Sequence, residues 1–231
     1  MKNDSLEKDL KSFLSLYLKF ERINIPRNKY LILRGDIDVC DTQGNYLKTF
    51  EVDIFINRKS YPYTIPLVKE TSEFIDRNDD WHVNNEGLCC LDIDHKLLKL
   101  SQRGIHVSEF YQDVIYPFFC NTVFKQLYND YANGEYPHEF NGVRSFYKLE
   151  LKLEEPKLII DILRSINTNK TPGRNQLCIC GKTKYKKCSD HFKSIQFLKS
   201  LPRERILKDL KSFEEEFLGY RNKTNKSVGT L

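Results

Sequence analysis

Two groups of cysteines have spacings that could support chemistry, one near the middle of the chain and one near its end. In the first group, Cys89 and Cys90 are adjacent and follow His82, Asn84 and Gly87 in the segment WHVNNEGLCCLDI. A cysteine thiol has an ordinary pKa of about 8.5, so its thiolate fraction at neutral pH suffices for thioester exchange without a dedicated base. If the segment is extended, successive side chains alternate, and one of the two cysteines is expected to be buried. The alternative to a reactive cysteine is that both thiols only pack against neighbouring residues and take part in no reaction.

The polar residues ahead of the cysteine pair could assist such chemistry. When an amine attacks a thioester, negative charge develops on the carbonyl oxygen, and an amide donor such as Asn84 could stabilise it; one such donor contributes about 3–4 kcal/mol in well-studied sites. His82 is expected to brace the loop. For both residues, simple hydrogen bonding within the loop is the alternative.

The second group lies in GRNQLCICGKTKYKKCSDH, where Cys178 and Cys180 precede Gly181 and Cys188 returns eight residues later. About twenty residues cannot bury enough apolar surface to fold alone, whereas a structural zinc ion contributes an apparent ~10–16 kcal/mol at neutral pH. The spacing therefore predicts a small zinc knuckle. The lysines between the cysteines form either a solvated face or a docking surface for an acidic partner: Lys182, Lys184, Lys186 and Lys187.

Composition limits the classes of protein that this chain can be. The 231 residues allow one substantial domain and a small appendage. The amino terminus alternates charged and apolar residues, as neither a secretory signal nor a membrane span does. Seven cysteines without such a signal favour the cytoplasm, where thiols stay reduced, and Cys40 and Cys120 are expected to be core residues. The net charge of +5 does not demand nucleic acid, and we expect none.

The first half of the chain has the pattern of a helix followed by a strand meander. Leu6, Leu10, Phe13, Leu14 and Tyr17 recur at helical spacing. Two β-rich runs, 29–41 and 46–58, flank a turn-forming cluster and predict a hairpin, with a third short strand at 65–68. Prolines then make a rigid connector at 61–66, and the long irregular segment 73–99 carries the first cysteine group.

The second half is predicted to be helical. A helix from Val107 runs through Phe124, Leu127 and Tyr128 and is kinked or split by Pro117. Further boundaries are marked by turn and cap residues: Asn133-Gly134 ends this helix, Pro156 opens another, Thr171-Pro172-Gly173 is a linker, and a last helix begins near Pro202 and fades after Gly219.

The order of these features resembles that of the ubiquitin-conjugating enzyme family. In that family a meander precedes a Tyr-Pro…Pro connector, a His-Pro-Asn element and a Gly-x-x-Cys-Leu-Asp active-site run. The matching positions here are Tyr61, Pro62 and Pro66, then His82 and Asn84, then Gly87, Cys90, Leu91 and Asp92. Val83 replaces the family's proline, and Asn84 lies two residues closer to the cysteine than usual. The glycine spacing selects Cys90 as the exposed nucleophile, and GEYPHEFNGVRSFY looks like divergent bacterial members.

The second cysteine group resembles the SEC-C zinc motif, which ends the bacterial preprotein translocase ATPase and is appended to many bacterial proteins. In that motif the fourth ligand directly follows the third cysteine, a position occupied by Ser189 here. His191 is the nearest substitute and would complete a tetrahedral Cys178, Cys180, Cys188, His191 site of structural type.

Together these resemblances imply an α+β, conjugating-enzyme-like fold with a zinc knuckle. The expected domains are 1–152 (conjugating), 153–172 (helix and linker), 173–193 (knuckle) and 194–231 (helix and polar tail). The implied function is a transferase that forms a thioester between Cys90 and the carboxyl terminus of a protein and passes it to an amine of a lysine-bearing acceptor. Divergent relatives act in bacterial anti-phage defence on a cGAS-like nucleotidyltransferase. The alternatives are an inactive adapter module and nucleic-acid binding through the knuckle.

Overall fold

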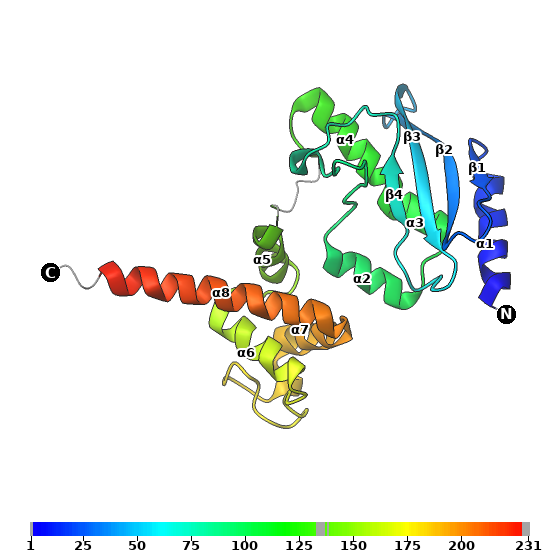
Figure 1. The fold of residues 1–231 in the computed structure, drawn as a ribbon. Coiled ribbons are helices and arrows are strands. Elements are labelled where there is room, and N and C mark those ends of the chain that lie inside the picture. The colour runs from blue at the N-terminus through cyan, green and yellow to red at the C-terminus, as the bar shows by residue number, and fades with distance from the viewer. Residues whose placement is uncertain (1, 133–136, 138, 228–231) are drawn as a thin grey trace. The chain divides into compact units, whose positions relative to one another are not determined.

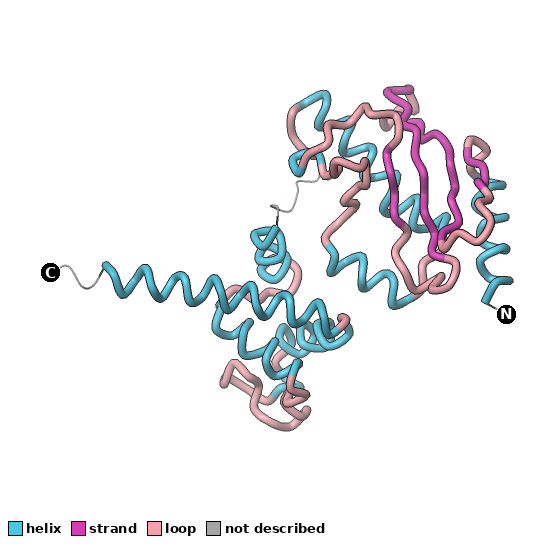
Figure 2. The backbone as a smooth tube through the Cα atoms, viewed as in Figure 1, coloured by secondary structure: helices cyan, strands magenta, loops and turns pink. Residues whose placement is uncertain are grey.

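The computed structural model describes residues 2–132, 137 and 139–227, which form two compact units, 1–135 and 136–231 (Figure 1). All the strands in the described residues belong to the first unit, and the second unit is built from helices and loops (Figure 2). The α+β class predicted from the sequence is therefore confirmed. None of the described helices combines the length and the apolar character needed to cross a bilayer.

The first unit holds a four-stranded antiparallel sheet in the order β1-β2-β3-β4. The predicted hairpin is confirmed as β2 (Tyr30–Cys40) and β3 (Tyr46–Asn57), and the predicted third strand is β4 (Leu67–Glu70). Asp41 makes the hairpin turn, because its carboxylate accepts the backbone N–H groups of Gln43 and Asn45. An additional edge strand, β1 (Phe20–Ile23), was not predicted.

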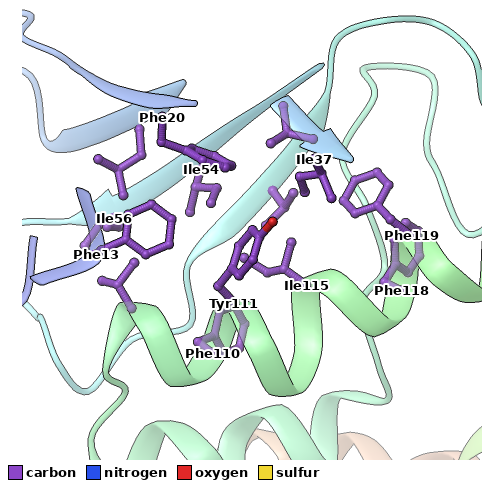
Figure 3. Packing of buried hydrophobic residues seen from close by; sticks show 14 of the residues in the cluster. Phe13, Phe20, Ile37, Ile54, Ile56, Phe110, Tyr111, Ile115, Phe118 and Phe119 are labelled. Carbon is purple, nitrogen blue, oxygen red and sulfur yellow. The ribbon is translucent and has the colours of Figure 1, made fainter. Parts of the chain in front are cut away.

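The core of this unit lies between the sheet and the helices (Figure 3). The predicted amino-terminal helix is α1 (Lys2–Leu16), and its buried side chains include Leu6 and Leu10. The Phe13 ring packs edge-on against Phe20 and Tyr111, with centroids 5.2 and 5.6 Å apart. Since Phe20 comes from β1 and Tyr111 from the later helices, these rings join three distant parts of the chain.

The predicted split at Pro117 is present. The chain forms α2 (Asp94–Arg103) and α3 (Val107–Phe110), then a π-helical turn (Tyr111–Ile115) that leads into α4 (Tyr116–Tyr128). Proline cannot donate a hydrogen bond to the carbonyl four residues earlier, so the wide turn falls directly before it. Helix α4 ends as Asn129 adopts a left-handed conformation; Asn133-Gly134, predicted to end it, lie outside the described residues.

The buried face of α4 differs from the predicted one. Phe124, Leu127 and Tyr128 are exposed, whereas Thr122 and Lys125 are buried. Near its carboxyl end, α4 has apolar residues on more than one face, so their spacing did not identify the face that is buried. The two cysteines expected in the core, Cys40 and Cys120, are only half-buried.

The second unit contains α5 (Glu139–Leu149), α6 (Pro156–Asn167), α7 (Ser189–Ser200) and α8 (Arg203–Ser227). Helix α6 begins at Pro156 as predicted, and the Glu155 carboxylate caps it. The division between the units falls at 135/136 rather than 152, because Tyr147 of α5 packs against Phe213 of α8. The predicted boundary at 193/194 falls inside α7, and α8 continues beyond Gly219.

Candidate functional site

The segment that carries Cys90 extends the sheet beside the edge strand β4. The carbonyl of Gly87 accepts the Glu70 N–H (2.9 Å), and the Cys89 N–H donates to the Val68 carbonyl (2.9 Å). An isolated bridge pairs Lys69 with Leu88 between these two bonds. The cysteine pair is therefore held by sheet hydrogen bonds, although it lies in a segment predicted to be irregular.

Gly87 is required by the close approach of this segment to β4. Its φ is +86°, and a Cβ there would lie 2.7 Å from the Glu70 carbonyl oxygen. Any other residue would meet both backbone strain and a clash with main chain. The glycine of the Gly-x-x-Cys pattern thus has a local structural reason.

A short antiparallel turn places the two cysteines on opposite sides. Val83 pairs with Cys89, and the Cys90 N–H donates to the His82 carbonyl (2.7 Å). Val83 is buried, Cys89 is half-buried against the core, and Cys90 is exposed. This is the alternation expected of extended backbone, and it gives Cys90 the exposed position that the glycine spacing selected.

Asn84 and His82 both make loop hydrogen bonds. The Asn84 Oδ1 accepts the N–H groups of Glu86 (3.0 Å) and Leu88 (2.9 Å), which closes the turn. His82 has a left-handed backbone (φ 54°), its N–H donates to Asp79, and its ring lies 5.6 Å from that of Tyr131. These contacts match the bracing role expected for His82 and the loop-bonding alternative for Asn84.

The surroundings of Cys90 disfavour its thiolate. Its pKa is raised, first by partial desolvation and then by the negative charges of Asp94, Asp92 and Asp79. Burial raises the pKa of Cys89 further, to about 12. The ordinary cysteine pKa assumed from the sequence is therefore too low for both residues, because the burial that raises it most depends on packing that the local motif does not show.

We expect substitution of Asp94 by asparagine to shift the pH dependence of Cys90 alkylation to lower pH. Of the three nearby carboxylates, Asp94 has the largest effect on the pKa of the thiol. The pKa should stay above the ordinary value because desolvation remains. Iodoacetamide labelling from pH 6 to 10, read by peptide mass spectrometry, measures this. Asp36→Asn, an exposed carboxylate on β2, is the matched control and should leave the profile unchanged. An identical profile for Asp94→Asn and wild type would contradict the electrostatic account.

A buried ion pair anchors the start of this loop, and the sequence did not reveal it. Glu70, at the end of β4, is fully buried, and Arg77 contacts both its carboxylate (2.5 Å) and its carbonyl oxygen (3.0 Å). The same carboxylate accepts the Phe74 N–H (3.2 Å) and the Ser72 hydroxyl. The only signal in the sequence is a charged residue at the end of a short β-rich run.

The second candidate site is a cluster of possible metal ligands in the second unit. One ligand atom each from Cys178, Cys180, Cys188 and His191 lie within 4.8 Å of one another, so these residues could bind a metal ion. Individual separations are 3.8 Å for Cys180 Sγ to Cys188 Sγ, 3.6 Å for Cys178 Sγ to His191 Nδ1, and 3.3 Å for Cys188 Sγ to His191 Nδ1. These are the four residues that the sequence nominated.

Local backbone structure brings the four ligands together. A turn joins Cys178 to Cys180, with Gly181 in a left-handed conformation (φ 74°) and its N–H bonded to the Cys178 carbonyl. Cys188 and His191 flank the start of α7 and lie one helical turn apart on the same side. Beneath them, the buried Tyr185 ring packs on Phe192 (4.9 Å).

Comparison with known proteins gives no relative from which a function could be transferred. No family model, curated protein or solved structure matches the chain.

Proposed function

We propose that the chain is a cysteine-dependent acyl transferase of the ubiquitin-conjugating type, with Cys90 as its nucleophile. The Cys90 thiolate attacks the activated carboxyl terminus of a protein, the activating group leaves, and a thioester forms. An amine of a lysine-bearing acceptor then attacks the thioester carbonyl, the Cys90 thiolate departs, and the attacking nitrogen loses a proton to give an amide.

The observation that carries this proposal is the presentation of Cys90. Cys90 is an exposed residue on a segment fixed by hydrogen bonds to β4 and to His82, while the adjacent Cys89 packs against the core. A nucleophile that accepts a protein carboxyl terminus must be reachable and held in place at the same time. Of the two adjacent thiols, only Cys90 meets both requirements.

The biological setting is proposed from the resemblance stated above. A conjugating-type domain joined to a knuckle of the SEC-C type would act in bacterial anti-phage defence, in the cytoplasm. The acyl donor would be the carboxyl terminus of a cGAS-like nucleotidyltransferase. Asn84 stays a candidate for stabilising the oxyanion through its Nδ2, because its Oδ1 is used by the loop.

For the ligand cluster we propose a structural zinc ion. A tetrahedral zinc ion with Zn–S of about 2.3 Å and Zn–N of about 2.0–2.1 Å separates two sulfurs by about 3.8 Å and a sulfur from a nitrogen by about 3.6 Å. The separations in the cluster are 3.8, 3.6 and 3.3 Å. Three thiolates and one imidazole suit zinc, and four protein ligands leave no position for a catalytic water.

The proposed transfer is tested by intact-mass spectrometry of the chain co-expressed with the proteins encoded beside its gene. Wild type should carry a thiol-labile mass increment, Cys90→Ser should carry the same increment as a more durable oxyester, and Cys90→Ala should carry none. Cys89→Ser is the matched control, because it changes the neighbouring thiol only, and it should retain the increment. The mass itself identifies the donor.

A second candidate function is an inactive binding module of the same fold. The raised pKa of Cys90 favours this candidate, because it lowers the thiolate fraction at neutral pH. An absence of any increment in all variants, with the neighbouring proteins present and zinc bound, would support the binding module and overturn the transferase.

A further inference from the structure

Lys125 is a buried cation in the first unit, at the carboxyl-terminal end of α4. Its side chain is 6% exposed. The other buried residues of α4 are apolar or small, so Lys125 is the one charged residue among them. Lysine is rarely buried unless its ammonium group finds partners. The contacts of the Lys125 ammonium group identify the partners that compensate for its burial.

Within the part of the chain that the structure describes, the ammonium group contacts the turn Asp79–Trp81 and Tyr131. The Nζ atom donates to the Asp80 carbonyl oxygen (2.6 Å) and lies 3.0 Å from the Asp80 carboxylate. It also lies 4.9 Å from the centroid of the Trp81 ring and 4.4 Å from that of Tyr131. The Tyr131 hydroxyl donates to the same Asp80 carbonyl (3.0 Å). We call these four residues the Lys125 cage: Asp80, Trp81, Lys125 and Tyr131.

The cage is connected to Cys90 through two backbone hydrogen bonds. The turn Asp79–Trp81, to which Lys125 is hydrogen-bonded, leads directly into His82. The His82 N–H donates to the Asp79 carbonyl (3.0 Å). The carbonyl of His82 in turn accepts the Cys90 N–H (2.7 Å). The His82 ring lies beside Tyr131 as well, so the cage supports both the backbone and the side chain of the residue opposite Cys90.

We propose that Lys125 is a positioning residue. It fixes His82 and Val83, the loop segment opposite Cys90, and through this segment the orientation of the nucleophile. The inference rests on the proposed function, because positioning has a purpose only if Cys90 reacts. The Asp80 carboxylate is 68% exposed, so the lysine is not there to neutralise a buried acid. An apolar side chain would fill the α4 position at less desolvation cost. What only the cation supplies is the bond to the Asp80 backbone and the attraction to two aromatic faces.

The test uses Lys125→Met, which keeps the length of the side chain and removes its charge. Cysteine alkylation by iodoacetamide, resolved by peptide mass spectrometry, reports each thiol separately. We expect Cys89 and Cys90 to react about tenfold faster in this variant, because loss of the hydrogen bonds from a charged donor allows local opening. Opening uncovers the half-buried Cys89 and relieves the desolvation that disfavours the Cys90 thiolate. Cys40 and Cys120, which lie elsewhere in the same unit, should react at the wild-type rate. Trp81 is the chain's single tryptophan, so its fluorescence reports directly on the loss of the cage.

Lys48→Met is the matched control. The Lys48 Nζ also lies over aromatic rings, those of Phe50 and Phe74, and it bonds to Gln126, the neighbour of Lys125 on α4. Its loss should leave the alkylation of Cys89 and Cys90 unchanged. If Lys125→Met does not fold, as faster reaction of Cys40 and Cys120 would reveal, Asp80→Asn removes only the surface carboxylate from the cage and should give a smaller acceleration confined to Cys89 and Cys90.

The proposal is overturned if a folded Lys125→Met protein changes the Trp81 emission but alkylates all its cysteines at wild-type rates. Unchanged rates in folded Asp80→Asn, where Lys125→Met fails to fold, overturn it as well. Alkylation needs no acyl donor, so this outcome is independent of the mass increment that tests the transferase. Where a donor is found, Lys125→Met should transfer more slowly while Cys40 and Cys120 keep their wild-type alkylation rates; general destabilisation would accelerate those two cysteines as well.

Discussion

Removal of the proposed zinc ion, or substitution of one of its four candidate ligands, should unfold the segment around them while the first unit stays folded. The hairpin at 176–185 and the start of α7 are joined by one aromatic pair among the described side chains, Tyr185 and Phe192. A structural zinc ion contributes an apparent ~10–16 kcal/mol at neutral pH, far more than this packing. We therefore expect Cys188→Ser to abolish stoichiometric zinc and to remove hydrogen-exchange protection across 174–192. Lowering the pH should weaken zinc binding, because protons compete for the thiolates and the imidazole.

Two further variants separate the proposed ligand set from the one that the SEC-C motif would use. His191→Ala should lose zinc as Cys188→Ser does, whereas Ser189→Ala should keep it, because Ser189 is not among the four converging residues. Cys120→Ser, a half-buried cysteine of the first unit, controls for thiol loss. Full zinc occupancy in His191→Ala, measured by elemental analysis of the purified protein, would remove His191 from the site.

The parts of the molecule that could be predicted from sequence are those determined by local periodicity. The β2–β3 hairpin was predictable because its second run alternates apolar and polar residues, with Phe55 as the exception. Four of its apolar residues are buried: Phe50, Val52, Ile54 and Ile56. Helix α6 was predictable because Pro156 follows a capping carboxylate. Both signals lie within a few residues of the structure that they specify.

The parts that could not be predicted depend on contacts between distant residues. β1 has only four residues and is a strand because it pairs with Ile32–Gly35, a contact that its own sequence does not specify. From the sequence alone, Lys125 would be predicted to lie on the surface. Its partners belong to the Asp79–Trp81 turn, and Trp81 precedes it by 44 positions. The same holds for the burial of Cys89, which raises its pKa and depends on packing against the core.

The two candidate sites differ in this respect. The ligand cluster lies within fourteen consecutive positions, 178–191, so the cysteine spacing and the resemblance to the SEC-C motif together predicted all four residues. The spacing of Cys188 and His191 is also that of one helical turn, a signal that would have predicted the start of α7. The Cys90 site instead depends on β4, α4 and the loop between them, so the sequence predicted its candidate nucleophile but not the residues that hold it in place.

In the second unit, Asp209→Ala should cost about 3–5 kcal/mol of unfolding free energy, because it removes one partner of a buried ion pair. Asp209 is fully buried; its carboxylate accepts the Tyr147 hydroxyl (2.8 Å) and lies 2.5 Å from the Arg205 guanidinium, which is 9% exposed. Burial, and then the charge of Asp209, raise the pKa of Tyr147 well above its ordinary value, so the hydroxyl stays a donor. Hydrogen exchange of α6 and α8, which pack together, measures the loss.

Companion variants distinguish an uncompensated charge from a simple loss of packing. Tyr147→Phe removes only one hydrogen bond to a charged acceptor and should cost about 1.5–3 kcal/mol. The double substitution Arg205→Met with Asp209→Leu removes both charges and should recover most of the stability lost in Asp209→Ala. The urea transition of Trp81 fluorescence, which reports on the first unit, should be the same in all three proteins. If the double variant is no more stable than Asp209→Ala, packing around Asp209, and not the unpaired guanidinium of Arg205, accounts for the loss.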